Sequence, residues 1–210
     1  MNEYKKVIDE KTNIAPKSIL EIGSRDGHDS NTLKNFFAVE DKNVWLVEPN
    51  PNQVLKIKKD YPNFNIVEKA ISGENRQIEF NCVEDENFIG ISSLLDRVDN
   101  FYNNVKTKKI IVESITGVQL MDLINCEIDL CKIDVEGLTY EVIESFKDKL
   151  KLIKSIHIEC EHVEIWKGQK LFFDIHKLLT DNNFKMEYFT FVAGGEIQSD
   201  SIWVNRNYLK

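Results

Sequence analysis

The sequence predicts a doubly wound α/β fold, in which a mostly parallel seven-stranded sheet ends in a C-terminal antiparallel hairpin. Apolar runs of strand length alternate with segments of helix length from residue 18 to residue 182. Two strand-like runs then follow each other directly, joined by the pair Gly194-Gly195, which predicts a hairpin. Because strands that are covered on both faces are continuously apolar, we expect a parallel sheet between two layers of helices.

The elements are expected in the following order. Strands are predicted at 18–23, 43–48, 64–71, 75–83, 110–115, 128–134 and 154–160, and the hairpin at 185–191 and 199–205. Helices are predicted at about 28–38, 51–60, 116–125, 138–150 and 169–182. Pro49 and Pro51 end the second strand, and Thr116 is suited to cap a helix N-terminus. The polar segment 84–109 is predicted to be a lid or specificity element.

Composition limits the class of protein. The chain has 210 residues and a net charge of −8, and it shows no repeat or linker, so we expect a single domain over residues 1–210. No basic stripe is present, which argues against a nucleic-acid partner. The four cysteines have no CxxC spacing, and no signal or membrane-spanning segment is seen, so a cytoplasmic protein is expected. The sequence leaves open whether the chain is a monomer or a homodimer.

The stretch SILEIGSRDGHDS, residues 18–30, places two glycines after the first predicted strand. Gly23 allows a sharp turn and Gly27 a close approach, and the following helix N-terminus is suited to an anionic group. The spacing G-x-x-x-G differs from the G-x-G-x-x-G of dinucleotide sites. Glu48 ends the second strand, where a carboxylate can accept hydrogen bonds from ribose hydroxyls. Together these features favour an adenosine-bearing ligand.

Several segments give this interpretation a specific form. The stretches EIGSRDG, VEPNP, KAIS, ISSL and above all LCKIDVEGLTYEVIESF resemble the FkbM-type family of S-adenosylmethionine (SAM)-dependent methyltransferases, over roughly residues 18–185. The resemblance implies the Rossmann-like class I methyltransferase fold and O-methylation of a sugar or natural-product hydroxyl.

The resemblance also implies site residues. The first loop would hold the methionine end of SAM, Glu48 would bind the ribose, and residues 69–71 would border the adenine. Asp134 would face the sulfonium and the acceptor. The loop departs from the family pattern at Arg25 and Asp26, and Arg25 could instead face an anionic acceptor. The implied cofactor-binding residues are Glu21, Gly23, Ser24, Arg25, Asp26, Gly27, Glu48, Ala70, Ile71 and Asp134.

An alcohol acceptor requires a positioned base, or a metal that acidifies the hydroxyl. Candidates lie in KIDVEG, with Asp134 and Glu136, and in IHIECEH, with His157, Glu159, Glu161 and His162. We expect the catalytic groups to be Asp134, Glu159 and His162, with Glu159 or His162 as the base. A metal-free hydrogen-bond network is favoured. A divalent metal held by Asp134, Glu159 and His162 is the alternative, and a purely structural His157 with solvated acids is the third.

The sequence thus predicts a SAM-dependent O-methyltransferase that acts on a small carbohydrate, a sugar nucleotide or a related metabolite. Two other functions stay open. One is a non-catalytic protein of the same fold that binds SAM or a nucleotide, and the other is an NAD-dependent oxidoreductase. Ser92 and Ser93 of GISSLL are either ligand contacts or part of a surface turn.

Overall fold

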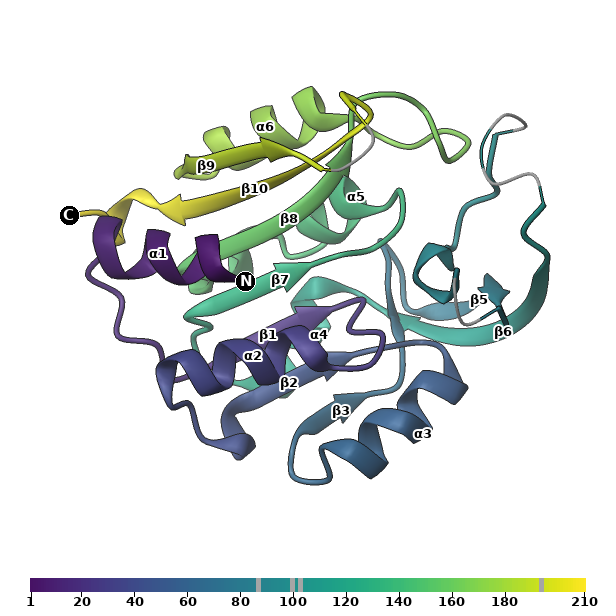
Figure 1. Ribbon diagram of the computed structural model, residues 1–210, viewed down its shortest axis with the longest axis horizontal. Coiled ribbons are helices and arrows are strands. Elements are labelled where there is room, and N and C mark those ends of the chain that lie inside the picture. Colours follow the sequence, from purple (N-terminus) through teal and green to yellow (C-terminus); the bar gives the residue numbers. More distant parts are fainter. Residues whose placement is uncertain (86–87, 99–100, 102–103, 193–194) are drawn as a thin grey trace.

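A seven-stranded sheet forms the centre of the part of the chain that the computed structural model describes, residues 1–85, 88–98, 101, 104–192 and 195–210 (Figure 1). The strands lie in the order β3-β2-β1-β7-β8-β10-β9. Their bounds are β1 Ile19–Ile22, β2 Val44–Val47, β3 Asn65–Val67, β7 Leu130–Ile133, β8 Ser155–Glu161, β9 Phe184–Phe191 and β10 Gln198–Asn205. The five strands β3, β2, β1, β7 and β8 are parallel to one another, whereas β10 is antiparallel to both of its neighbours. The predicted fold class is therefore confirmed, while the expected turn residue Gly194 lies outside the described residues.

Helices cover both faces of this sheet. They are α1 Asn2–Lys11, α2 His28–Phe37, α3 Pro51–Asp60, α4 Gly117–Ile124, α5 Thr139–Glu144 and α6 Phe172–Asp181. Side chains alternate across the sheet, so that Leu20 and Ile22 of β1 pack in one core with α4, α5 and α6, and Ile19 packs in the other with α1, α2 and α3. Within the described residues, none of these helices has the length and apolar character needed to cross a membrane.

The helix boundaries agree with the sequence prediction at one position and differ from it at two. Thr116 caps α4 as predicted, because its hydroxyl accepts the main-chain N–H of Gln119 at 3.2 Å. The helix predicted at 138–150 ends at Glu144 instead, and residues 147–152 form a 3₁₀ helix that begins with Lys147 at a φ of +49°. The helix predicted from 169 begins at Phe172, where the Asp174 carboxylate accepts the N–H of Leu171.

The N-terminal helix α1 was not among the predicted elements. Its buried face is short and consists of Tyr4, Val7 and Ile8, which pack in the core with α2 and α3. The Tyr4 hydroxyl lies 3.1 Å from the main-chain oxygen of Cys131 and 2.8 Å from the Ser155 hydroxyl, at the centre of the sheet. This long-range contact stabilises a helix that its own sequence barely indicates.

A second, three-stranded sheet lies beside the first, in the order β4-β6-β5, with β4 Ala70–Ile71, β5 Arg76–Val83 and β6 Thr107–Ile115. The single strand predicted at 64–71 is thus wrong, because the chain turns at residues 68–69, where the N–H of Lys69 bonds the main-chain oxygen of Val67. The strand predicted at 110–115 begins earlier, at Thr107. Apolar periodicity indicates a strand but not its partner, which is why the side sheet was not foreseen. The loops at the carboxyl ends of β1, β2, β7 and β8 form the edge that carries the site described below.

Candidate active site

The loop after β1 is built around Gly23. Its φ is +78°, and a Cβ at this position would lie 2.0 Å from the main-chain oxygen of Asp134. The N–H of Gly23 bonds the main-chain oxygen of Val47 at 3.0 Å, and the N–H of Asp134 bonds that of Ile22 at 2.9 Å. The ends of β1, β2 and β7 are therefore joined so closely that only glycine fits between them. Gly27 also has a positive φ, +74°, and a Cβ there would lie 2.9 Å from Leu46 Cδ1.

Glu48, at the end of β2, is buried and fixed by the main chain. One carboxylate oxygen accepts the N–H of Arg25 and the other accepts the N–H of Asn50, each at 2.8 Å. Burial raises the pKa of Glu48 to about 7, although both backbone N–H groups act to lower it. Each oxygen keeps a further lone pair for a ligand hydroxyl.

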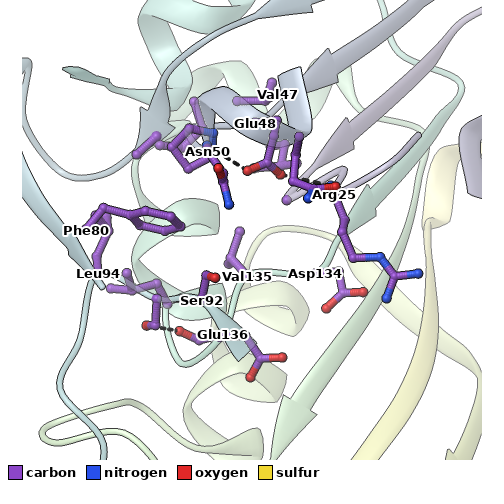
Figure 2. A pocket seen from close by; sticks show the side chains of 18 of the residues that line it. Arg25, Val47, Glu48, Asn50, Phe80, Ser92, Leu94, Asp134, Val135 and Glu136 are labelled. Carbon is purple, nitrogen blue, oxygen red and sulfur yellow. Dashed lines mark hydrogen bonds between the residues drawn. The ribbon is translucent and has the colours of Figure 1, made fainter. Parts of the chain in front are cut away.

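Glu48 lies at an apolar cleft of about 630 Å³, including its open mouth. Figure 2 shows Phe80 and Leu94 across this cavity from the Glu48 carboxylate, with Val135 on the side toward Asp134. The strands of the side sheet supply Ala70, Ile71 and Phe80, so this sheet forms one wall of the cleft. A narrow apolar space with a carboxylate at one end is suited to a flat ring that is attached to a sugar.

The segment between β5 and β6 closes part of this cleft through two serines. The Ser93 hydroxyl donates to the main-chain oxygen of Glu136 at 2.6 Å, and Ser92 accepts the N–H of Val83 at 3.0 Å. Both serines line the cleft. Residues 86–87, 99–100 and 102–103 of the predicted lid, 84–109, lie outside the described residues.

A second, polar cleft of about 890 Å³ adjoins the first. The two share the lining residues Gly23, Arg25, Gly90, Asp134 and Glu136. Arg25 has a φ of +47°, and its guanidinium lies 3.7 Å from the Asp26 carboxylate and is more than half exposed. Figure 2 shows the Arg25 side chain passing beside Asp134, at the junction between the two spaces.

Acidic groups concentrate in the polar cleft. Asp134, Glu136 and Glu159 each offer a carboxylate oxygen, and these atoms lie within 4.8 Å of one another. Burial and the neighbouring charges of Asp134 and Asp200 raise the pKa of Glu159 to about 8. Burial, with Asp134 and Glu161, also raises the pKa of Glu136 well above its usual range. Such a group can hold a proton at neutral pH, and its geometry is also compatible with a divalent cation.

Lys132 lines the polar cleft but is not among the predicted site residues. Its ammonium lies 2.6 Å from Asp29, 2.8 Å from Asp134 and 3.9 Å from Glu21. Burial alone would lower the pKa of Lys132, but these three carboxylates together raise it above the usual value. Burial raises the pKa of Glu21 to about 7, against the opposing effects of Lys132 and of the Ser30 N–H that its carboxylate accepts. A lysine inside a buried strand was the available signal, since such a charge needs partners.

The structure brings most of the predicted site residues together, but not all of them. Glu48, Ala70 and Ile71 line only the apolar cleft, whereas Glu21, Ser24, Asp26 and Glu159 line only the polar cleft. Gly23, Arg25 and Asp134 line both. Gly27 lines neither and instead starts α2.

His162 does not join Asp134 and Glu159. Its Nε2 lies 2.8 Å from the Ser199 hydroxyl, and its ring stacks on Phe172 with centroids 4.8 Å apart. Among the described residues it lines neither cleft, and Glu136 takes the third place in the acidic cluster. The chain leaves β8 after Glu161, which turns the next side chain toward the hairpin. His157 bonds Asp200 at 3.2 Å.

The strand order and the antiparallel hairpin are those of the class I methyltransferase fold. The chain belongs to the methyltransferase FkbM domain family, whose model matches residues 21–186. No curated protein is significantly similar to it in sequence.

Solved structures show the same fold at low identity. The methyltransferase FkbM from Methylobacillus flagellatus has a TM-score of 0.59 and 9% identity, and the match covers 90% of this chain but only 44% of that one. M. capricolum TrmK, solved with S-adenosyl-homocysteine, has a TM-score of 0.56 and 12% identity over 99% of this chain and 68% of that one. The Methanococcus jannaschii fibrillarin pre-rRNA processing protein has a TM-score of 0.56 and 11% identity, over 98% and 75% of the two chains.

Proposed function

We propose that this chain is a SAM-dependent O-methyltransferase whose acceptor is a hydroxyl of a small carbohydrate or a related metabolite. The observation that carries the proposal is the meeting of an apolar cleft, which has a carboxylate at one end, with an acidic cleft at Asp134 and Glu136. A methyl donor and its acceptor must meet in line, and two adjoining spaces provide that arrangement.

The apolar cleft accounts for the adenosine half of SAM. Its adenine would lie between Ile71, Phe80 and Leu94, and its ribose hydroxyls would donate to the free lone pairs of Glu48. The methionine end would then follow the loop of Gly23 toward the polar cleft. This orientation would bring the sulfonium methyl near Asp134, at the junction of the clefts.

Glu159 is the proposed base. SAM held in the apolar cleft would supply the methyl group and leave as S-adenosylhomocysteine, and the Glu159 carboxylate would take the proton that the acceptor hydroxyl loses. With a pKa raised to about 8, ionised Glu159 is a stronger base than an ordinary glutamate. The neighbouring carboxylates of Asp134 and Glu136 would orient the acceptor by accepting hydrogen bonds from its other hydroxyls.

The charge of the polar cleft bears on the acceptor. Six of its lining residues are carboxylic acids, Glu21, Asp26, Asp29, Asp134, Glu136 and Glu159, against the two cations Arg25 and Lys132. Since Lys132 already contacts three of these acids, a phosphorylated acceptor has few groups to neutralise it. The cleft therefore favours an uncharged polyhydroxyl acceptor over a sugar nucleotide, and over the backbone of a nucleic acid.

Calorimetric titration tests the cofactor directly. The chain should bind SAM and S-adenosylhomocysteine at micromolar concentration and should not bind NAD, which serves as the control. Transfer of a radiolabelled methyl group to a panel of neutral sugars, against their phosphorylated forms, then tests the acceptor. Binding without transfer to any hydroxyl would favour the non-catalytic alternative, and a failure to bind SAM would contradict the proposal.

Treatment with a chelator distinguishes the two possible roles of the acidic cluster, which are proton acceptance and binding of a divalent cation. If Asp134, Glu136 and Glu159 act as a proton-accepting network, methyl transfer should survive treatment with a chelator. Loss of transfer that magnesium or manganese restores would instead assign these carboxylates to a divalent cation.

A further inference from the structure

Trp166 is a large buried side chain that lies outside the apolar cores. It is 1% exposed, yet it belongs to none of the three apolar clusters that the described residues form. The other fully buried tryptophan, Trp203, packs in the core with α4, α5 and α6, and its indole N–H donates to the Ser201 hydroxyl at 2.9 Å. The Trp166 indole N–H has no hydrogen-bond partner among the described residues. Because a buried donor without an acceptor costs free energy, this N–H needs an explanation beyond packing.

The indole of Trp166 lies against the chain at Glu136 and Gly137. Gly137 has a φ of +79°, and a Cβ there would lie 2.6 Å from Trp166 Cδ1, the ring carbon bonded to Nε1. Burial raises the pKa of Glu136, and the neighbouring indole N–H acts against that rise. The two groups stand beside each other without a completed hydrogen bond. Since the last torsion of a glutamate is soft, a turn of the Glu136 carboxylate would complete it.

Hydrogen bonds fix the chain on either side of the indole. The side-chain oxygen of Gln169 accepts the N–H of Trp166 at 2.6 Å, and the Gln169 amide donates to Glu161 at 2.9 Å. The N–H of Lys167 bonds the main-chain oxygen of Asp96 at 2.8 Å. Trp166 is therefore held between the end of β8 and the segment that connects β5 to β6, and its indole stays beside Glu136.

We propose that Trp166 is a positioning residue, whose indole N–H donates to the Glu136 carboxylate and holds it at the junction of the two clefts. Glu136 lines both clefts, whereas Trp166 lines neither and would act only through Glu136. The Ser93 hydroxyl already holds the main-chain oxygen of Glu136 at 2.6 Å, so the indole would fix the side-chain end as well. The other carboxylate oxygen then stays turned toward the acceptor. This inference rests on the proposed function, because Glu136 has an acceptor to orient only if the polar cleft binds one.

The indole N–H resonances test the contact without an enzyme assay. The chain has three tryptophans, and single replacements by phenylalanine assign their signals in a proton–nitrogen correlation spectrum of the full chain. Glu136→Gln should move the Trp166 signal more than those of Trp45 and Trp203, because Trp203 donates to a hydroxyl instead. A Trp166 signal that stays in place would overturn the proposal.

Methyl transfer to a neutral sugar tests the positioning role with a double-mutant cycle. Trp166→Phe keeps an aromatic ring against Gly137 but removes the N–H. It should lower kcat/KM for the acceptor about tenfold or more and leave the dissociation constant of S-adenosylhomocysteine unchanged. In a chain that carries Glu136→Ala, the same replacement should have little further effect, since the carboxylate on which Trp166 acts is gone.

Trp203→Phe is the matched control. It makes the same change at an equally buried tryptophan that lines neither cleft, and it should leave kcat/KM unchanged. If Trp166→Phe lowered kcat/KM by the same factor with and without the Glu136 carboxylate, Trp166 would be structural only and the positioning role would be overturned. If the parent transfers no methyl group to any acceptor, the proposed function fails, and the Trp166 signal still decides whether the indole contacts Glu136.

Discussion

Replacement of Glu48 by glutamine tests the proposal that this carboxylate binds the ribose of SAM in the apolar cleft. The carboxylate already accepts the N–H groups of Arg25 and Asn50 at 2.8 Å, so it holds two loops in place whether or not a ligand is bound. Glutamine has nearly the same shape but only one acceptor oxygen. Its amide N–H₂ would face one of the two backbone donors, which would lose its hydrogen bond.

Two separate losses follow. The unpaired buried N–H should lower the free energy of unfolding by about 1–3 kcal/mol. If Glu48 also binds the ribose, loss of the charged acceptor should weaken S-adenosylhomocysteine binding by about 1–3 kcal/mol, which is about a 5- to 150-fold rise in its dissociation constant. Stability and affinity should therefore both fall.

The assay pairs urea unfolding with calorimetric titration of S-adenosylhomocysteine for the same protein samples. Glu68→Gln is the control, because Glu68 follows the neighbouring strand but is exposed, and its carboxylate pairs with Lys58 at the surface. That variant should leave both quantities unchanged. If Glu48→Gln lowered stability and left affinity intact, Glu48 would be a structural tie between loops, and the ribose assignment would be refuted.

Three further changes probe the rest of the site. Gly23→Ala should destabilise the fold by at least about 1–2 kcal/mol and abolish cofactor binding, because alanine disfavours a φ of +78° and its Cβ would clash with the main-chain oxygen of Asp134. Gly73→Ala is the control, since Gly73 has open space around it, and it should leave the free energy of unfolding in urea unchanged. Glu159→Gln should reduce methyl transfer by about 100-fold or more, and the parent's rate should rise with pH up to about 8, as Glu159 loses its proton. Folding raises the pKa of Glu159 from 4.5 to about 8, so the protonated group contributes its full stability below pH 4.5 and loses it as pH rises to about 8. In urea unfolding, the free energy of unfolding of Glu159→Gln relative to the parent should therefore be higher at pH 8 than at pH 4.5. Lys132→Met should lower the free energy of unfolding by about 3–5 kcal/mol at pH 8 and less at pH 5, where the carboxylates left behind can bind protons; an equal loss at both pH values would contradict the charge argument.

The loops that form the apolar cleft at Gly23 and Glu48 could be predicted from the sequence because they depend on short stretches of chain. The turn at Gly23 and the carboxylate of Glu48 each follow directly from the end of a buried strand, and a strand end is visible in the apolar pattern. Parallel strands then bring their carboxyl ends to one edge of the sheet, so residues from separate strands meet there. The same reasoning indicated Asp134 and Glu159.

The predictions were weaker where a side chain's direction depends on packing. Alternation along β8 could suggest which residues share a face, but His162 follows the end of that strand and stacks on Phe172 of α6. Phe80 was assigned only to a strand, and its place in the cleft depends on the side sheet that β5 forms with β6. Nothing local in the sequence marks such a ring as a ligand contact rather than a core residue.

Apart from α1 and the break between β3 and β4, alternating apolar runs and their breaks by themselves determined the order of strands and helices, the closing hairpin and the loop at Gly23. Those features depend on solvent exclusion and backbone geometry over a few residues. Tertiary structure alone decided that residues 70–71 leave the main sheet and that Lys132 gathers three carboxylates. Each of these depends on which strands pair across long stretches of chain, and strand pairing is a balance of many distant contacts that no local pattern contains.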